Sequence, residues 1–132
     1  MLFRSEAGNW LPDLLPHLEG RVTTSALNVP IQRGSLLDLS LAFSDESITV
    51  EAVNDAIRNA SLLRPELIQV SEDPIVSSDV IGQSCTVLFD APGTIKAGSR
   101  MIKLLGWYEN LGHAARLLNV ARLYTEMEAA GA

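Results

Sequence analysis

The chain has 132 residues, enough for one globular domain, and its 47% hydrophobic and 20% charged residues are unlike the composition of disordered chains. Its net charge of −6 argues against a surface for nucleic acid or an anionic membrane, and no apolar run reaches the roughly 20 residues of a membrane span. The N-terminus lacks the residue order of a signal peptide and a single cysteine cannot form an internal disulfide, so we expect a cytoplasmic protein.

The first two predicted elements are a short helix and a strand. Residues 9–18 favour a helix whose length is limited by Pro12 and Pro16, because proline lacks the amide donor that a helix interior needs. Residues 21–29 are rich in Val, Thr and Leu and lie between a glycine and a proline, which is typical of a strand.

Strict alternation of apolar and polar residues marks the next segment. Every second residue from Leu37 to Phe43 is large and apolar, so these residues fall on one face of a half-buried strand. The short connection 31–34 predicts an antiparallel hairpin between this strand and the one before it.

A helix is predicted to follow this strand. Thr49 is its expected N-cap and Glu51 lies in its first turn, where a carboxylate meets the positive end of the helix dipole. The spacing of apolar residues predicts a core-facing stripe made of Val50, Val53, Ala56, Ile57 and Ala60. Three polar residues are expected to face water: Asn54, Asp55 and Arg58.

The second half of the chain predicts three strands and a final helix. The strands are 67–70, 86–90 and 101–108, with a turn at 91–93 joining the last two, and the helix runs over 112–127. The expected core stripe of that helix consists of Leu117, Val120, Ala121, Tyr124 and Met127.

This order of elements is not a regular alternation of strands and helices. We therefore expect an α+β fold in which residues 1–132 form a single domain. Its sheet is expected to be mixed and mainly antiparallel, with helices on one face and a long C-terminal helix.

The tract from Ile102 to Asn110 reads I-K-L-L-G-W-Y-E-N, and a helical pattern follows it directly. It resembles the V-K-L-x-S-W-Y-D-N signature of phosphorylating glyceraldehyde-3-phosphate dehydrogenases, where a strand leads into the final helix. Motifs similar to five others of that family occur in the family's order, at residues 15–23, 28–30, 35–39, 76–79 and 89–90. The resemblance covers the C-terminal portion of the catalytic domain, which in the family is a mainly antiparallel mixed sheet. Erythrose-4-phosphate dehydrogenases share these motifs.

The resemblance implies two site residues. In the family, the Asn that ends the W-Y-D-N segment hydrogen-bonds the nicotinamide carboxamide of NAD, and Asn110 stands at this position as a vestigial cofactor-binding residue. Asn is also a favoured helix cap, so a purely structural role for Asn110 stays open. The family's phosphate-binding Arg before V-P is replaced by Asn28, which lacks the permanent charge and the bidentate donor of arginine.

Other parts of the family's chemistry have no counterpart in these 132 residues. The S-x-C-T-T-N motif of the nucleophile does not occur, nor does the G-x-G-x-x-G fingerprint of an NAD-binding Rossmann domain. Cys85 falls at a non-catalytic family position, where we expect a buried or strand-edge thiol. His113 lies near a helix start, where we expect packing or exposure. We expect no metal site at His17.

Two kinds of function remain open. In the first, the chain is a catalytic-domain fragment of an NAD-dependent oxidoreductase that acts on the aldehyde group of a sugar phosphate; alone it is inactive and binds no cofactor. In the second, it is a non-catalytic interaction or regulatory module that pairs with itself or with a full-length dehydrogenase. For both we expect a homo-oligomer formed through an exposed sheet face, because one helical layer covers only one face.

Overall fold

The computed structural model describes residues 2, 3 and 7–131, and the chain divides into two compact units, Met1–Gln32 and Arg33–Ala132. The first unit contains helix α1 (Ala7–Leu14), the 3₁₀ turn η1 (Pro16–Leu18) and a strand pair, β1 (Leu2–Phe3) with β2 (Ala26–Leu27). The predicted short helix is therefore confirmed, with Pro12 inside α1 and the second proline starting the separate turn η1.

The predicted strand over 21–29 is largely wrong. Only Ala26 and Leu27 form a strand, and they pair with β1 rather than with the strand that follows in the sequence. Val, Thr and Leu favour extended backbone, but a strand also needs a partner, and β3 (Ser35–Ala42) pairs along its whole length with β6 (Met101–Tyr108). The predicted hairpin is wrong for the same reason.

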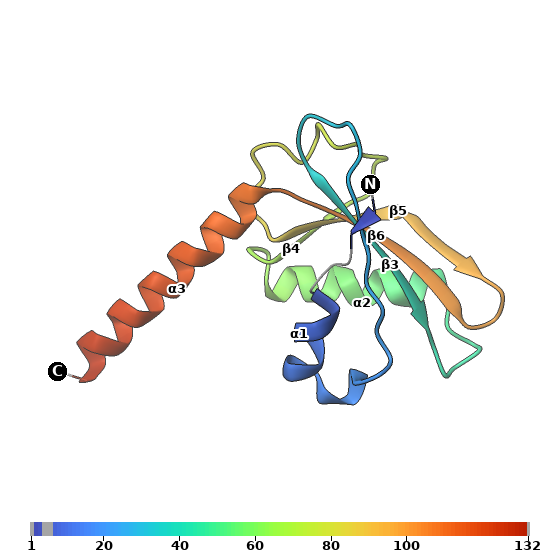
Figure 1. The fold of residues 1–132 in the computed structure, drawn as a ribbon, viewed down its shortest axis with the longest axis horizontal. Helices are drawn as coiled ribbons and strands as arrows, with labels where there is room; N and C mark the ends of the chain where they lie inside the picture. The colour runs from blue at the N-terminus through green and yellow to red at the C-terminus, as the bar shows by residue number, and fades with distance from the viewer. Residues whose placement is uncertain (1, 4–6, 132) are drawn as a thin grey trace. The chain divides into compact units, whose positions relative to one another are not determined.

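The second unit is built on a four-stranded sheet in the order β3-β6-β5-β4 (Figure 1). β5 (Val87–Ala97) and β6 are antiparallel, as are β6 and β3, whereas β4 (Ile68–Ser71) runs parallel to β5. The unit also contains α2 (Val50–Leu63) and the long C-terminal helix α3 (Asn110–Gly131). The α+β class and the mixed, mainly antiparallel sheet are confirmed.

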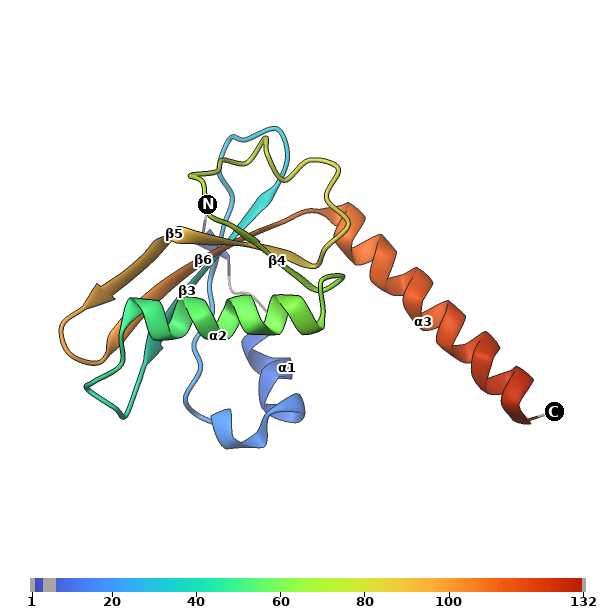
Figure 2. The same cartoon turned by 180° about the vertical axis from the view of Figure 1, so that it is seen from behind.

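Helix α2 packs on one face of this sheet (Figure 2). The hydroxyl oxygen of Thr49 accepts a hydrogen bond from the Ala52 N–H at 3.1 Å, which confirms the predicted N-cap. The core between helix and sheet consists of Val53, Phe89, Ala91, Ile102 and Leu104, and Ile102 is fully buried. The two central strands and α2 thus supply the hydrophobic centre of the unit.

The prediction that Asn54 faces water is wrong. Its side chain is only 7% exposed, whereas Ala56, expected in the core stripe, is exposed. The Asn54 Nδ2 donates to the carbonyl oxygen of Ala91 at 3.2 Å, and its Oδ1 accepts from the Thr94 hydroxyl at 2.7 Å. A carboxamide with both groups bonded can replace an apolar residue in the interface.

The predicted turn at 91–93 is also wrong. β5 continues through these residues as a bulge, seen as a register shift against β6 between Asp90 and Ile95. The bulge frees backbone groups that Asn54 partly satisfies, and the Gly93 N–H donates to the Asp90 carboxylate at 3.1 Å. The reversal between β5 and β6 comes later, where Gly98 has a φ of 63°.

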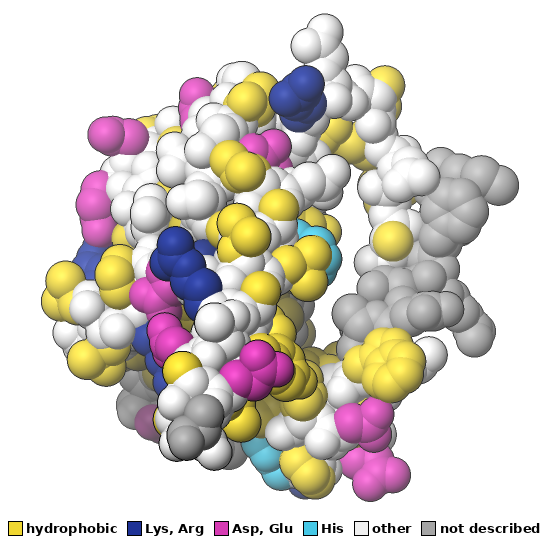
Figure 3. Space-filling view, turned by 90° about the vertical axis from the view of Figure 1, so that its left-hand side faces the viewer, with side chains coloured by type: hydrophobic (Ala, Val, Ile, Leu, Met, Phe, Trp, Pro, Cys, Tyr) yellow, Lys and Arg dark blue, Asp and Glu magenta, His cyan; other side chains and the backbone are white. Residues whose placement is uncertain are grey.

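The predicted core stripe of the last helix is also wrong. Every residue of α3 from Leu117 to Gly131 is exposed, including Leu117 at 59% and Tyr124 at 64%. Figure 1 shows α3 extending away from the sheet, and hydrophobic side chains lie open on the surface drawn in Figure 3. Among the helices described, none has the length and apolar character needed to cross a membrane.

Candidate functional site

Most of the family-like motifs in the second unit meet where β6 passes into α3. We call this region the β6–α3 junction and define it as residues 76–86 together with residues 107–116. The loop side begins with a closed turn, because the Val76 N–H donates to the Asp79 carboxylate at 2.8 Å. The loop is tied to the W-Y-E-N segment by the Gly82 N–H, which donates to the Glu109 carboxylate at 2.9 Å.

The start of α3 lies directly against the backbone of Cys85. A Cβ atom placed on Gly112 would lie 2.2 Å from the carbonyl oxygen of Cys85, so only glycine allows this approach. Further along the helix, the Arg116 guanidinium donates to the carbonyl oxygen of Glu66, just before β4. The first two turns of α3 are therefore anchored, and the helix is free of the sheet only beyond them.

The strand motif at 35–39 also meets the loop motif at 76–79. Gly34 has a φ of 83°, and a Cβ atom there would lie 2.9 Å from both the Ser77 carbonyl oxygen and a methyl carbon of Val80. Val80 is almost completely buried. Two motifs that are about 40 residues apart in the sequence thus form one packed contact.

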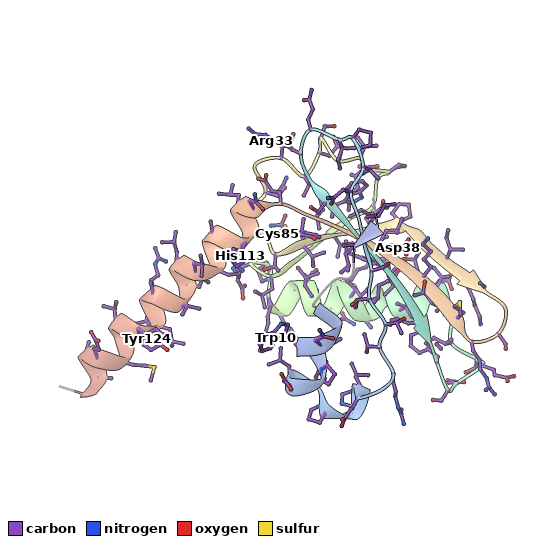
Figure 4. The ribbon with its side chains drawn as sticks, viewed as in Figure 1. Trp10, Arg33, Asp38, Cys85, His113 and Tyr124 are labelled. Carbon is purple, nitrogen blue, oxygen red and sulfur yellow. The ribbon has the colours of Figure 1, made fainter. Side chains whose placement is uncertain are left out.

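Cys85 is buried at this junction, at 3% exposure, which confirms the expectation for it. Burial raises the pKa of the Cys85 thiol, and the charge of Arg116 opposes this rise. A thiol that is both buried and held protonated is unsuited to act as a nucleophile. Figure 4 shows Cys85 and His113 in the same region, and His113 is exposed, in agreement with the expectation for it.

Asn110, the predicted cofactor residue, is the first residue of α3 and is exposed. The residue before the helix is Glu109, whose carboxylate bonds Gly82 as described above. The structure therefore places the Asn110 carboxamide on the surface at the head of a helix whose first turns are anchored. Its contact with a nicotinamide stays a prediction.

Asn28, the predicted phosphate-site residue, directly follows β2 and is exposed. It belongs to the first unit and Asn110 to the second, and its role also stays a prediction. Among the residues that the structure describes, no group of three or more His, Cys, Asp and Glu side chains is arranged to hold a metal ion.

Sequence reasoning missed the structural roles of Glu109 and Arg116. Glu109 was visible only as a departure from the Asp of the family signature, and nothing in the helix pattern singled out Arg116. The junction also contains two buried nitrogen atoms without a hydrogen-bond partner in the described part of the chain, Trp107 Nε1 and Arg116 Nε. The junction holds the backbone of the loop and of the start of α3 in place, and it presents one exposed carboxamide. It contains, among its described residues, no acid and base side chains paired for proton transfer.

Residues 4–110 match the family model described as "Glyceraldehyde 3-phosphate dehydrogenase, C-terminal domain". The chain is 40% identical over 112 residues to glyceraldehyde-3-phosphate dehydrogenase 1 of Streptomyces avermitilis, covering 83% of this chain and 33% of the relative. It is 34% identical over 113 residues to the glyceraldehyde-3-phosphate dehydrogenase of Borreliella burgdorferi, again covering 83% and 33%. The chain thus spans about a third of the length of the curated relatives it matches.

Proposed function

Because the chain belongs to the glyceraldehyde 3-phosphate dehydrogenase C-terminal domain family, we propose that it supplies the C-terminal part of the catalytic domain of such an enzyme. The reaction of that enzyme is the NAD-dependent oxidation of the aldehyde group of a sugar phosphate, in the cytoplasm. The observation that supports this role best is the place of Asn110, which ends the W-Y-E-N segment and is exposed at the head of α3.

In this proposal the β6–α3 junction positions one contact to the cofactor. The Glu109–Gly82 bond and the close approach of Gly112 to Cys85 fix where α3 begins, and hence where the Asn110 carboxamide lies. A carboxamide has both donors and an acceptor, so it can form a hydrogen bond with the carboxamide of a nicotinamide. Asn28 takes the place of the family's phosphate-binding arginine and offers a weaker, uncharged contact.

By themselves these 132 residues do not catalyse the reaction. Their one cysteine is Cys85, which is buried and has a raised pKa, so it cannot serve as the thiolate nucleophile. One hydrogen bond from Asn110 contributes about 0.5–1.5 kcal/mol. Association with NAD first costs several kcal/mol of translational and rotational freedom, so the chain alone has no measurable affinity for NAD.

A chimera tests this function. The chain replaces the matching third of the Streptomyces avermitilis relative, and the oxidation of glyceraldehyde 3-phosphate is followed by the absorbance of NADH. We expect a folded, active chimera. A chimera that has the circular dichroism and oligomeric state of the relative, but no activity, would contradict the proposal.

A second function is supported by apolar side chains on the sheet face opposite α2, where Leu36, Ile95 and Met101 are exposed. We propose that the chain pairs with itself or with a full-length dehydrogenase, as an interaction module, through its exposed sheet. Exposed apolar area of this kind marks interfaces in soluble proteins. The sedimentation of the purified chain tests its pairing with itself, and a concentration-independent monomer of 14.3 kDa would contradict that pairing.

A further inference from the structure

Strand β3 forms an open edge of the four-stranded sheet. All eight of its residues pair with β6 on one side, and among the residues that the structure describes no strand of this sheet lies on the other side (Figure 1). The opposite edge is the four-residue strand β4. β3 is thus the longer of the two edges and the better template for an added strand.

The register identifies the backbone groups that this edge offers. The Phe43 N–H donates to the Arg100 carbonyl oxygen at 2.8 Å and so continues the β3–β6 ladder by one hydrogen-bonded pair. Hydrogen-bonded pairs alternate along an antiparallel ladder, so the odd-numbered residues of β3 bond β6. The N–H and C=O groups that point to the open edge therefore belong to Leu36, Asp38, Ser40 and Ala42.

The side chains along this edge do not protect it. Natural edge strands are commonly blocked by lysine, proline or a bulge, and β3 contains none of these. Leu37 and Leu39, on the face that α2 covers, are 48% and 40% exposed, and Leu36 is exposed on the other face. The only charged side chain of β3, Asp38, bonds Lys103 of β6 at 2.8 Å. The edge is therefore apolar and locally neutral although the chain carries a net charge of −6.

We infer that β3 pairs with β3 of a second copy of this chain, antiparallel and about a two-fold axis at Leu39. This deepens the proposed self-association and rests on it, but it assigns the contact to the sheet edge instead of the sheet face. The two four-stranded sheets then join into one continuous sheet. Two-fold pairing of identical edges closes the assembly without any other molecule.

The sequence of β3 selects this register. With the axis at Leu39, Asp38 lies opposite Ser40 of the copy and Leu37 opposite Leu41, and all four outward-facing residues find partners. An axis at Asp38 would place two carboxylates opposite each other, which is unfavourable. A slip by a single residue would turn the apolar face of one copy to the polar face of the other.

Disulfide trapping tests the register. Across the axis, two Leu39 residues form a non-hydrogen-bonded pair with Cα atoms about 4.5 Å apart, a distance that a disulfide spans. With oxidised glutathione as the oxidant, Leu39→Cys is expected to give a covalent dimer. Leu37→Cys is the matched control, because Leu37 faces Leu41 and not itself, and it is expected to stay uncrosslinked. Equal crosslinking of both variants, of neither, or of Leu37→Cys alone would overturn the inference.

Matched lysine variants distinguish the edge from the face. Leu39→Lys places two like charges at the axis, whereas Met101→Lys adds the same charge to an exposed position on the face opposite α2. In sedimentation velocity, Leu39→Lys is expected to be a monomer and Met101→Lys a dimer like the unmodified chain. The reverse result would place the interface on the face and overturn the edge, while sparing self-association. A monomeric unmodified chain would overturn both self-association and the edge contact. This would hold even if hydrogen exchange showed that another segment protects the β3 edge.

Discussion

Prediction from the sequence failed for the buried polar residues. These residues make the most specific contacts in the structure. Asn54 was expected in water because polar residues usually lie there, and periodicity gives no sign that a bulge across the interface requires a carboxamide. The bulge itself was hidden, because Pro92 and Gly93 resemble a turn. By contrast, Thr49 as N-cap was predicted correctly because capping depends on local sequence, and Cys85 as a buried thiol was predicted correctly from its family position.

The first prediction concerns Asn54. Asn54→Ala leaves the Ala91 carbonyl oxygen and the Thr94 hydroxyl without their partner inside the core, so we expect a loss of about 1–3 kcal/mol in the free energy of unfolding. Urea unfolding followed by circular dichroism measures it. Asn59→Ala, at an exposed position on the same helix, is the control and should have little effect. Equal losses in the two variants would mean that the bulge does not depend on Asn54.

The second prediction concerns the pH dependence that arises from Cys85. Because burial raises the pKa of its thiol, the folded state holds the proton at a pH where the unfolded chain loses it. The contribution of this group to stability is therefore complete below the ordinary cysteine pKa, about 8.5, and is lost as the pH rises above it. Cys85 in the native chain should also react slowly with a thiol reagent at neutral pH. Rapid labelling at pH 6 would contradict this.

At the scale of elements, the sequence predicted those strands and helices whose pattern is local and strong. The alternation in β3, the capped helix α2 and the strand β6 appear as expected, whereas the predicted hairpin and the core packing of α3 do not. The reason is physical: a pattern reports which face of an element is apolar, but not whether the chain contains a surface to cover it. The apolar residues of α3 show this most clearly, because they are exposed along most of the helix.

The third prediction follows from this exposure of α3. Removal of residues 119–132 should change the free energy of unfolding by less than about 0.5 kcal/mol, because every described side chain in that segment is exposed. Gly112→Ala should instead destabilise the chain by about 1–3 kcal/mol, since its Cβ would collide with the Cys85 carbonyl oxygen. Denaturant unfolding of the two variants is the measurement. A large loss on truncation would show that residues 119–132 of α3 pack on the rest of the second unit.

At the scale of the whole molecule, the chain belongs to the glyceraldehyde 3-phosphate dehydrogenase C-terminal domain family. It covers about a third of each relative, and most of the family-like motifs in its second unit meet at the β6–α3 junction. Neither the S-x-C-T-T-N motif nor the G-x-G-x-x-G fingerprint occurs in these 132 residues. The fold class and the family were predictable, because five ordered motifs and the W-Y-E-N segment are sequence features. The binding roles of Asn28 and Asn110 stay predictions.

The most direct test of this account is a calorimetric titration with NAD of the isolated chain and of the chimera with the Streptomyces avermitilis relative. We expect no measurable binding to the isolated chain at millimolar NAD and clear binding to the chimera. In the chimera, Asn110→Ala should weaken binding about 2- to 12-fold, the value of one hydrogen bond, while Asn119→Ala, at an exposed position of the same helix, should not. Micromolar binding of NAD to the isolated chain, or an equal affinity of the two chimera variants, would contradict it.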